Sequence, residues 1–153
     1  MQQVTRSQNC SMQVQVYLRQ VLKLKREIDE RDHAAKALSR EAAQLQSPSA
    51  GGCGGSDSRP TEASFVRKLD CSFEIEDEVK EKREQLALLL RQVWGVIDAL
   101  PCVDEREVLR YRYLEGLQWQ EIHEKLNVSP STAYAWHSRG LTHVVLPPDA
   151  IWL

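Results

Sequence analysis

Polar side chains recur at helical spacing in one short stretch of the sequence, SPSTAYAWHSRGL, which begins at position 129. On a helix, Ala133, Trp136 and Gly140 or Leu141 would face inward. The side chains left outside or at the rim are Ser131, Thr132, Tyr134, Ala135, His137, Ser138 and Arg139. Their chemistry is hydrogen bonding and charge contact with a polar ligand. No nucleophile–base pair, paired-carboxylate site or nucleotide-binding loop stands out, so an enzyme is not expected.

Local signals predict that this stretch is the last of three short helices. Pro101 ends whatever precedes it, and the first helix follows with an apolar face. Gly116 is suited to the left-handed conformation that commonly ends a helix. Trp119, Ile122 and Leu126 recur at spacings of three and four residues, which predicts a second helix with one apolar face.

A tight turn and a strong start signal separate the second and third helices. Asn127 tolerates positive φ in a turn. Ser129 is a good N-cap and Pro130 suits the first helical position. The third helix is therefore expected from Ser129 to Leu141, and the last two helices form a helix-turn-helix.

The run LP…EREVLRYRYLEGLQWQEIHEKLNVSPSTAYAWHSRGL resembles region 4 of sigma-70-type transcription factors, a helix-turn-helix that reads the promoter −35 element. The helix before the helix-turn-helix matches as well. Two positions depart from the family: His123 stands where Ala is usual, and Ala133 where Val, Ile or Thr is usual.

The resemblance implies a DNA-binding transcription regulator whose third helix enters the major groove. Four side chains would face base edges: Ser131, Thr132, Ala135 and Ser138. Others would contact bases or flanking phosphates: Tyr134, His137 and Arg139, with Ser129 at the start of the helix and Arg110 and Arg112 on the DNA backbone. Under this interpretation Arg139→Ala weakens DNA binding without lowering the melting temperature. The inward phase of Trp119 and Trp136 favours core packing.

Upstream, residues 12–46 carry an apolar heptad pattern that predicts a long coiled-coil-like helix. Its positions are Val14, Tyr17, Val21, Leu24, Ile28, Ala35, Leu38, Ala42 and Leu45, with Arg31 as the exception. A basic cluster on this helix could touch DNA phosphates or form a solvated face, and acidic residues follow it at once. It comprises Arg19, Lys23, Lys25 and Arg26.

Residues 47–60 are rich in Gly and Ser, which predicts a flexible linker. Thr61 is a plausible N-cap for a second long helix that runs to Leu100, with a stutter or kink near Asp70 to Ser72. Its heptad positions are Ile75, Val79, Lys82, Leu86, Leu89, Val93, Val96 and Leu100, and Phe65, Leu69 and Phe73 continue the apolar face.

The expected fold is all-α. Two long helices, residues 1–46 and 61–100, are joined by the linker and followed by the helix-turn-helix at 101–146 and a tail at 147–153. With its VYLRQVLKLKREIDE segment, this arrangement is similar to small phage and prophage proteins of Gram-positive bacteria that have a sigma-like C-terminal domain, and to related late-operon activators. The resemblance implies a phage-type activator without the promoter-melting region of a sigma factor.

The charge of the DNA-binding module indicates that additional contacts are needed for tight DNA binding. Residues 101–146 carry five basic and six acidic side chains, for a net charge of −1. Because phosphate contacts supply most non-specific affinity, one module should bind DNA weakly. Homo-oligomerisation through the heptad helices or docking on RNA polymerase would add contacts. Two other interpretations stay open: a phage terminase small subunit, and an adaptor that binds RNA polymerase but not DNA.

The remaining signals indicate a cytoplasmic protein. No run of eighteen apolar residues or signal sequence occurs. The four cysteines, Cys10, Cys53, Cys71 and Cys102, are widely spaced and are expected to be reduced thiols. The histidines lack metal-ligand spacing, so neither a metal nor another cofactor is expected.

Overall fold

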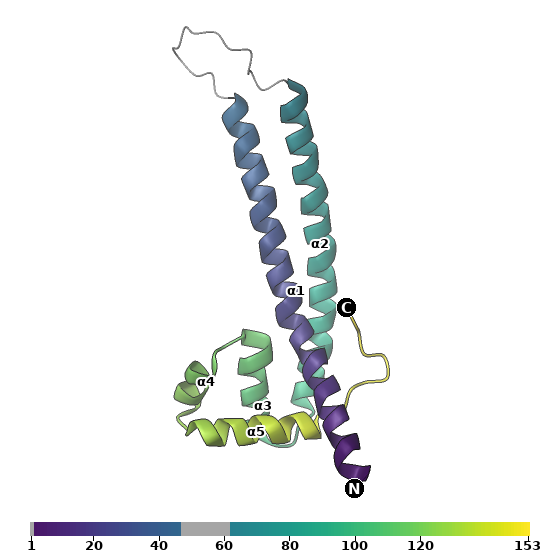
Figure 1. The fold of residues 1–153 in the computed structure, drawn as a ribbon, viewed down its shortest axis with the longest axis vertical. Helices are drawn as coiled ribbons and strands as arrows, with labels where there is room; N and C mark the ends of the chain where they lie inside the picture. Colours follow the sequence, from purple (N-terminus) through teal and green to yellow (C-terminus); the bar gives the residue numbers. More distant parts are fainter. Residues whose placement is uncertain (1, 47–61) are drawn as a thin grey trace. The chain divides into compact units, whose positions relative to one another are not determined.

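The structure is a computed structural model that describes the backbone of residues 2–46 and 62–153, and the side chains of 11–44 and 62–153. Within these ranges every element is helical, so the all-α prediction is confirmed. The elements in Figure 1 are α1 (Gln2–Gln46), α2 (Glu62–Asp98), α3 (Val103–Leu109), the π-helix η1 (Arg110–Glu115), α4 (Trp119–Leu126) and α5 (Pro130–His143). The predicted linker at 47–60 and the N-cap at Thr61 lie outside the described residues, as do the side chains of Cys10, Leu45 and Cys53.

The chain divides into two units, Arg26–Glu84 and Met1–Lys25 together with Gln85–Leu153. No helix in the described part of the chain is long and apolar enough to cross a membrane.

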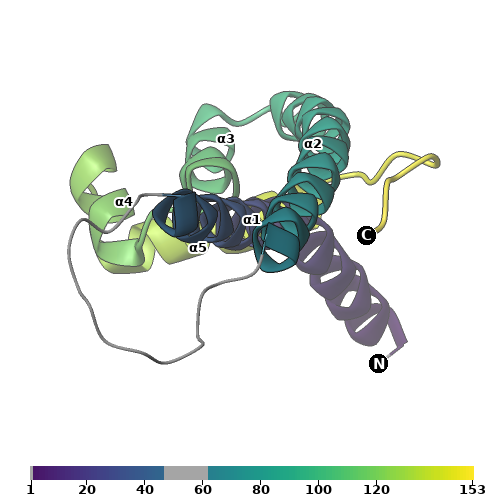
Figure 2. The same cartoon turned by 90° about the horizontal axis from the view of Figure 1, so that it is seen from above.

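The unit Arg26–Glu84 is an antiparallel helical pair, seen end-on in Figure 2. Ion pairs join the two helices, and their order along α2 is the reverse of their order along α1. Lys82 Nζ lies 2.9 Å from Glu27 Oε2, and Arg31 Nε lies 3.0 Å from Glu78 Oε2. Lys82 and Arg31, the polar exceptions in the two heptad patterns, are therefore paired across the helices. These contacts are partly or fully exposed, so they set register more than stability.

A buried serine replaces the apolar residue that the sequence pattern predicts in this pair. Ser72 is 1% exposed, and its hydroxyl lies 2.7 Å from that of Ser39 and 3.2 Å from the carbonyl of Ala35. Phe73, which was expected on the apolar face, is 58% exposed, so that prediction is wrong. α2 is one continuous helix from Glu62 to Asp98, so the stutter or kink predicted near Asp70 to Ser72 does not interrupt it.

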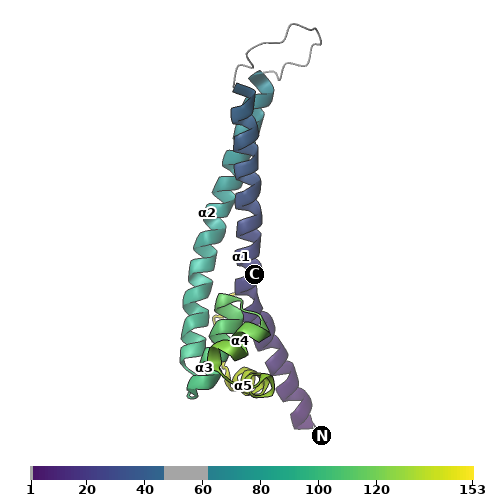
Figure 3. The same ribbon diagram turned by 90° about the vertical axis from the view of Figure 1, so that its left-hand side faces the viewer.

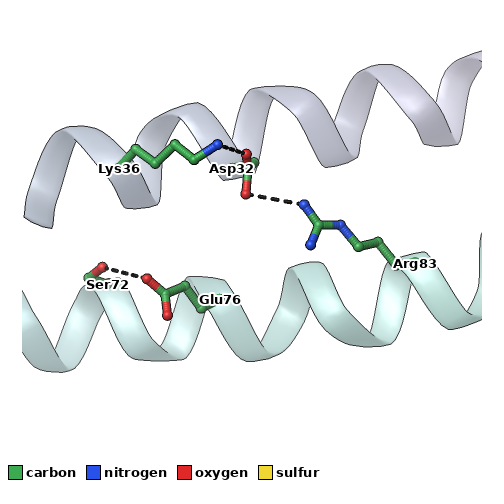
Figure 4. Close-up of polar contacts among 5 residues, drawn as sticks. All are labelled: Asp32, Lys36, Ser72, Glu76 and Arg83. Atoms are coloured by element: carbon green, nitrogen blue, oxygen red, sulfur yellow. Dashed lines mark hydrogen bonds and ion pairs between the residues drawn. The ribbon is translucent and has the colours of Figure 1, made fainter.

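Polar contacts also bridge the pair around Asp32 (Figure 4). Its carboxylate lies 2.5 Å from Lys36 Nζ on the next turn of α1 and 3.3 Å from Arg83 Nη2 on α2. The hydrogen bond from Lys36, with the charges of Lys36 and Arg83, lowers the pKa of Asp32. On α2, the Ser72 hydroxyl lies 3.4 Å from Glu76 Oε1.

The second unit has one apolar core to which α1, α2 and the helix-turn-helix all contribute. Most predicted heptad positions in this unit are buried, which confirms the stripes. The core consists of Val14, Tyr17, Leu18, Val21, Leu89, Val93, Val96, Ile97, Leu100, Leu109, Tyr113, Leu114, Leu141 and Val144. The stripes of α1 and α2 thus pack together within one chain, and α1 supplies part of the core of the helix-turn-helix.

The segment after α5 is held against α1 and α2 by two glutamines, and its course is visible in Figure 1. Gln92 Oε1 accepts hydrogen bonds from the Tyr17 hydroxyl at 2.6 Å and from the backbone N–H of Ile151 at 2.9 Å. Its amide nitrogen donates to the Asp149 carbonyl at 3.0 Å. Gln20 donates to the Ile151 carbonyl and accepts from the backbone N–H of Leu153. The tail is therefore part of this unit.

Candidate nucleic-acid interface

The turns of the helix-turn-helix follow the sequence signals. Gly116 has φ 78° after η1, and Asn127 has φ 52° at the end of α4. The Ser129 hydroxyl accepts a hydrogen bond from the backbone N–H of Thr132, and Pro130 is the first residue of α5. At the start of α4, Gln118 and Glu121 form a capping box. The predicted N-cap, proline and left-handed positions are confirmed.

The first helix departs from the expected α-helix. From Arg110 to Glu115 it widens to a π-helix, which is rare and frequently found at functional sites. Two side chains bind the carbonyls near its end: Lys25 Nζ donates to the Leu114 carbonyl at 2.6 Å, and Arg112 Nη1 donates to that of Leu117 at 2.9 Å. No feature of the sequence predicted this π-helical segment.

The recognition helix α5 presents most of the predicted polar set to its outer side. Ser131, Tyr134, Ala135, Ser138 and Arg139 are exposed, while Thr132 is half-buried and Ala133 is 1% exposed. Figure 3 views the molecule from the side of α4, with α3 and α1 on either side of α5. Because neighbours surround the inner face of α5, its outer row is the part available to a ligand.

The structure corrects the predicted set of outward-facing residues on α5 at His137. The residue is 9% exposed, and its Nε2 lies 2.9 Å from the Tyr113 hydroxyl. Burial, followed by the charges of Arg112 and Arg19, lowers the pKa of its imidazole to about 4. The neighbouring Trp136, expected to face inward, is only half-buried. The buried face of α5 therefore includes Ala133, His137 and Gly140, and the prediction that His137 faces outward is wrong.

Aromatic rings connect this interior to the outer face. Trp119, the first residue of α4, has its ring centroid 5.0 Å from that of His137 and 4.2 Å from that of Tyr134. Tyr134 is 49% exposed, so the Trp119–Tyr134 pair reaches the surface. Trp119 is half-buried and only partly fits the predicted core role. The pair holds Tyr134 at the edge of the polar row.

A buried carboxylate that the sequence reasoning missed orients Arg139. Glu105 is 3% exposed, and its oxygens lie 3.6 Å from Arg139 Nε and 2.7 Å from His143 Nδ1. Glu105 also lies in the first turn of α3, where a negative charge is favourable whichever way the side chain faces. Its spacing of three and four residues from the buried Val108 and Leu109 was the signal that it faces inward.

The two arginines of η1 lie in different surroundings. Arg110 forms an ion pair with Asp98, and its guanidinium carbon lies 4.8 Å from the ring centroid of Trp94. That of Arg112 lies 5.2 Å from the ring centroid of Trp119 on α4. Arg110 is thus committed to α2, whereas Arg112 borders the helix-turn-helix.

Comparison with known proteins agrees with this geometry. Residues 90–144 match the family model described as Sigma-70, region 4. The matched segment begins in α2 and spans α3, η1, α4 and α5. No curated protein and no solved structure was found to match the chain. The module is therefore a sigma region 4-like helix-turn-helix, a DNA-binding and non-enzymatic type of domain.

Proposed function

We propose that this protein is a sequence-specific DNA-binding regulator of transcription whose helix α5 enters the major groove. The observation that carries the proposal is the exposed row on α5 formed by Ser131, Ala135 and Ser138, with Tyr134 and Arg139 beside it. Short side chains there let the helix approach base edges, and the longer ones can reach phosphates. We propose DNA contacts for these residues and for Ser129, Thr132 and Arg112. His137 is left out because it is buried and contacts Tyr113, and Arg110 because it is paired with Asp98.

We further propose that it acts as a phage-type activator in contact with RNA polymerase. The helix-turn-helix has a net charge of −1, so docking on polymerase would supply contacts that DNA phosphates do not. The similarity of residues 90–144 to sigma region 4 supports this direction. A polymerase adaptor that never touches DNA is the competing function, and the same charge favours it.

A homo-oligomer also remains a proposal. Since the heptad stripes of α1 and α2 pack together within the chain, a second copy would have to exchange helices with the first or use another surface. Sedimentation velocity at several protein concentrations distinguishes a monomer from a dimer. A concentration-independent monomer would leave docking on polymerase as the source of added affinity.

The function is tested by footprinting the purified protein on promoters neighbouring its gene, with and without RNA polymerase. Protection without polymerase supports an independent regulator, and protection that requires polymerase supports a sigma-like factor. Protection in neither case contradicts the proposal.

One pair of matched variants ties the footprint to α5. Ala135→Glu places a negative charge on the exposed row, where it should abolish protection by repelling phosphates. Ala37→Glu makes the same change at an exposed position of α1 in the other unit and should leave the footprint intact. Circular dichroism of both variants verifies that they are folded.

A further inference from the structure

One side of α1 lies directly against η1 of the helix-turn-helix. A Cβ placed on Gly116 would be 3.1 Å from Leu22 Cδ2, and Lys25 Nζ donates its hydrogen bond to the Leu114 carbonyl. Closer to the N-terminus on this side, Gln15 and Arg19 approach the phenol of Tyr113. Residues 15, 19, 22 and 25 follow helical spacing, so a single face of α1 makes all these contacts.

Arg19 of α1 and Arg112 of η1 converge on the Tyr113–His137 pair. After burial, the charges of these two arginines are the causes that lower the pKa of His137. Both also act on the phenol of Tyr113, where their charges oppose the larger effect of burial on its pKa. The geometry agrees: Arg19 lies on the face of α1 that contacts η1, and the guanidinium carbon of Arg112 lies 5.2 Å from the ring centroid of Trp119, so both arginines border the helix-turn-helix.

Within the described part of the chain, neither Arg19 nor Arg112 forms an ion pair with a carboxylate, whereas Arg110, Lys125 and Arg139 of the same unit do. Residues 1–26 contain five basic residues and no Asp or Glu, so the N-terminal part of α1 carries a net positive charge. Like charges held close together repel each other, and a bound anion would relieve that repulsion.

The location of the pair indicates which anion it would meet. Arg112 lies over Trp119, the first residue of α4, and Trp119 contacts the exposed Tyr134 of α5. In a helix-turn-helix the first helix crosses the DNA backbone while the second enters the major groove. The edge with Arg112 is therefore the edge that a phosphodiester passes.

We propose that Arg19 and Arg112 together bind a DNA backbone phosphate, so that α1 is part of the DNA-binding surface. This inference rests on the proposed function, because it requires that α5 enters the groove. It assigns to α1 a purpose beyond covering the core: α1 supplies positive charge to a helix-turn-helix whose own net charge is −1. The short polar residues on α5 then read bases, and the arginine pair fixes the protein's register on the duplex.

The test is the salt dependence of binding to a duplex of about 30 base pairs, for which no target sequence is needed. Each phosphate contact contributes about 0.9 to the slope of log K against log salt. Arg19→Ala should reduce this slope by about 0.9. When salt rises from about 50 to 200 mM, the affinity of this variant should therefore fall by a factor roughly threefold smaller than that of the wild type. Arg19→Lys should restore the slope, since a point charge suffices for a phosphate.

Two further variants separate a phosphate contact from a structural role. Arg40→Ala removes an exposed arginine from the α1 segment of the other unit and should not alter the slope. Arg112→Ala should reduce the slope as Arg19→Ala does, and the double variant should reduce it by about twice as much. Melting temperatures verify that each variant remains folded.

The possible failures are distinguishable. If the wild-type protein binds DNA and Arg19→Ala has the same slope, the phosphate site is wrong and the proposed function stands. If Arg19→Ala and Arg40→Ala reduce the slope equally, the effect is one of net charge, and the site is again wrong. If the wild-type protein alone binds no duplex, the phosphate site is wrong, and the footprint with RNA polymerase decides the proposed function separately.

Discussion

The hydroxyl of Tyr113 lies 2.9 Å from Nε2 of His137, which joins η1 to the buried side of the recognition helix. A histidine on the outer side of α5 would have been a candidate DNA contact. In its place, the imidazole holds α5 against the first helix of the module. The stability of the DNA-binding unit should therefore depend on the protonation of this side chain.

Acidification is expected to weaken the folded unit through His137. Its pKa falls from the ordinary 6.5 to about 4 in the folded chain, so the unfolded chain binds the proton more readily. The stabilisation is fully present above pH 6.5 and is lost as the pH falls towards 4, by about 2 kcal/mol after allowance for solvent screening. Urea unfolding at pH 7 and pH 4.5 measures this change.

The matched comparison uses a histidine outside this unit. His137→Gln should lower stability at pH 7 but remove much of the extra loss at acidic pH. His33→Gln, at an exposed position of α1, should retain the wild-type dependence. An unchanged pH dependence in His137→Gln would show that other groups cause the acid sensitivity.

Arg139→Ala should reduce both DNA binding and stability. Sequence reasoning predicts a loss of binding alone, but the guanidinium is also paired with the buried Glu105. Because Arg139 is 57% exposed and His143 stays beside Glu105, we expect the free energy of unfolding to fall by only about 1 kcal/mol. DNA affinity should fall about tenfold, the effect of one lost charged contact.

Arg91→Ala is the control, since Arg91 is an exposed arginine of α2 in the same unit. It should alter neither quantity appreciably. Titration with labelled duplex and thermal unfolding measure the two effects side by side. A fall in melting temperature without any loss of affinity would make Arg139 a structural residue only.

Gln92→Leu should release the C-terminal segment from α1 and α2. The substitution removes three hydrogen bonds, to the Tyr17 hydroxyl, the Ile151 N–H and the Asp149 carbonyl. At about 1 kcal/mol for each bond, and with water replacing part of them, we expect a loss of about 2 kcal/mol. Limited proteolysis should then cleave residues 147–153 faster.

Gln85→Leu provides the comparison, because Gln85 is exposed on α2 in the same unit. Its cleavage rate and unfolding free energy should match those of the wild type. Equal protection of the tail in Gln92→Leu would mean that apolar packing of Ile151 holds the segment and that the glutamine is dispensable.

The sequence by itself determined the elements of this protein and their local junctions. Gly116 and Asn127 adopt the left-handed conformation, and Ser129 caps α5, because each of these depends on the residue and its nearest neighbours. The heptad spacing likewise located the buried faces of α1 and α2, since a helix repeats every 3.6 residues. The sequence pattern did not predict that Ser72 is buried in place of Phe73, because the Ser72 hydroxyl is satisfied by partners on another helix, α1.

Only the tertiary structure decided which neighbours those faces meet. Trp136 and His137 are adjacent in sequence and lie near the edge of the inner phase of α5, so periodicity could not choose between them. His137 is buried because Tyr113 offers it a hydrogen bond. Glu105 meets Arg139, and Lys25 meets the Leu114 carbonyl, across long separations in sequence. Such pairs depend on how helices pack against one another, and that packing determines which polar side chains of the module are left free for DNA.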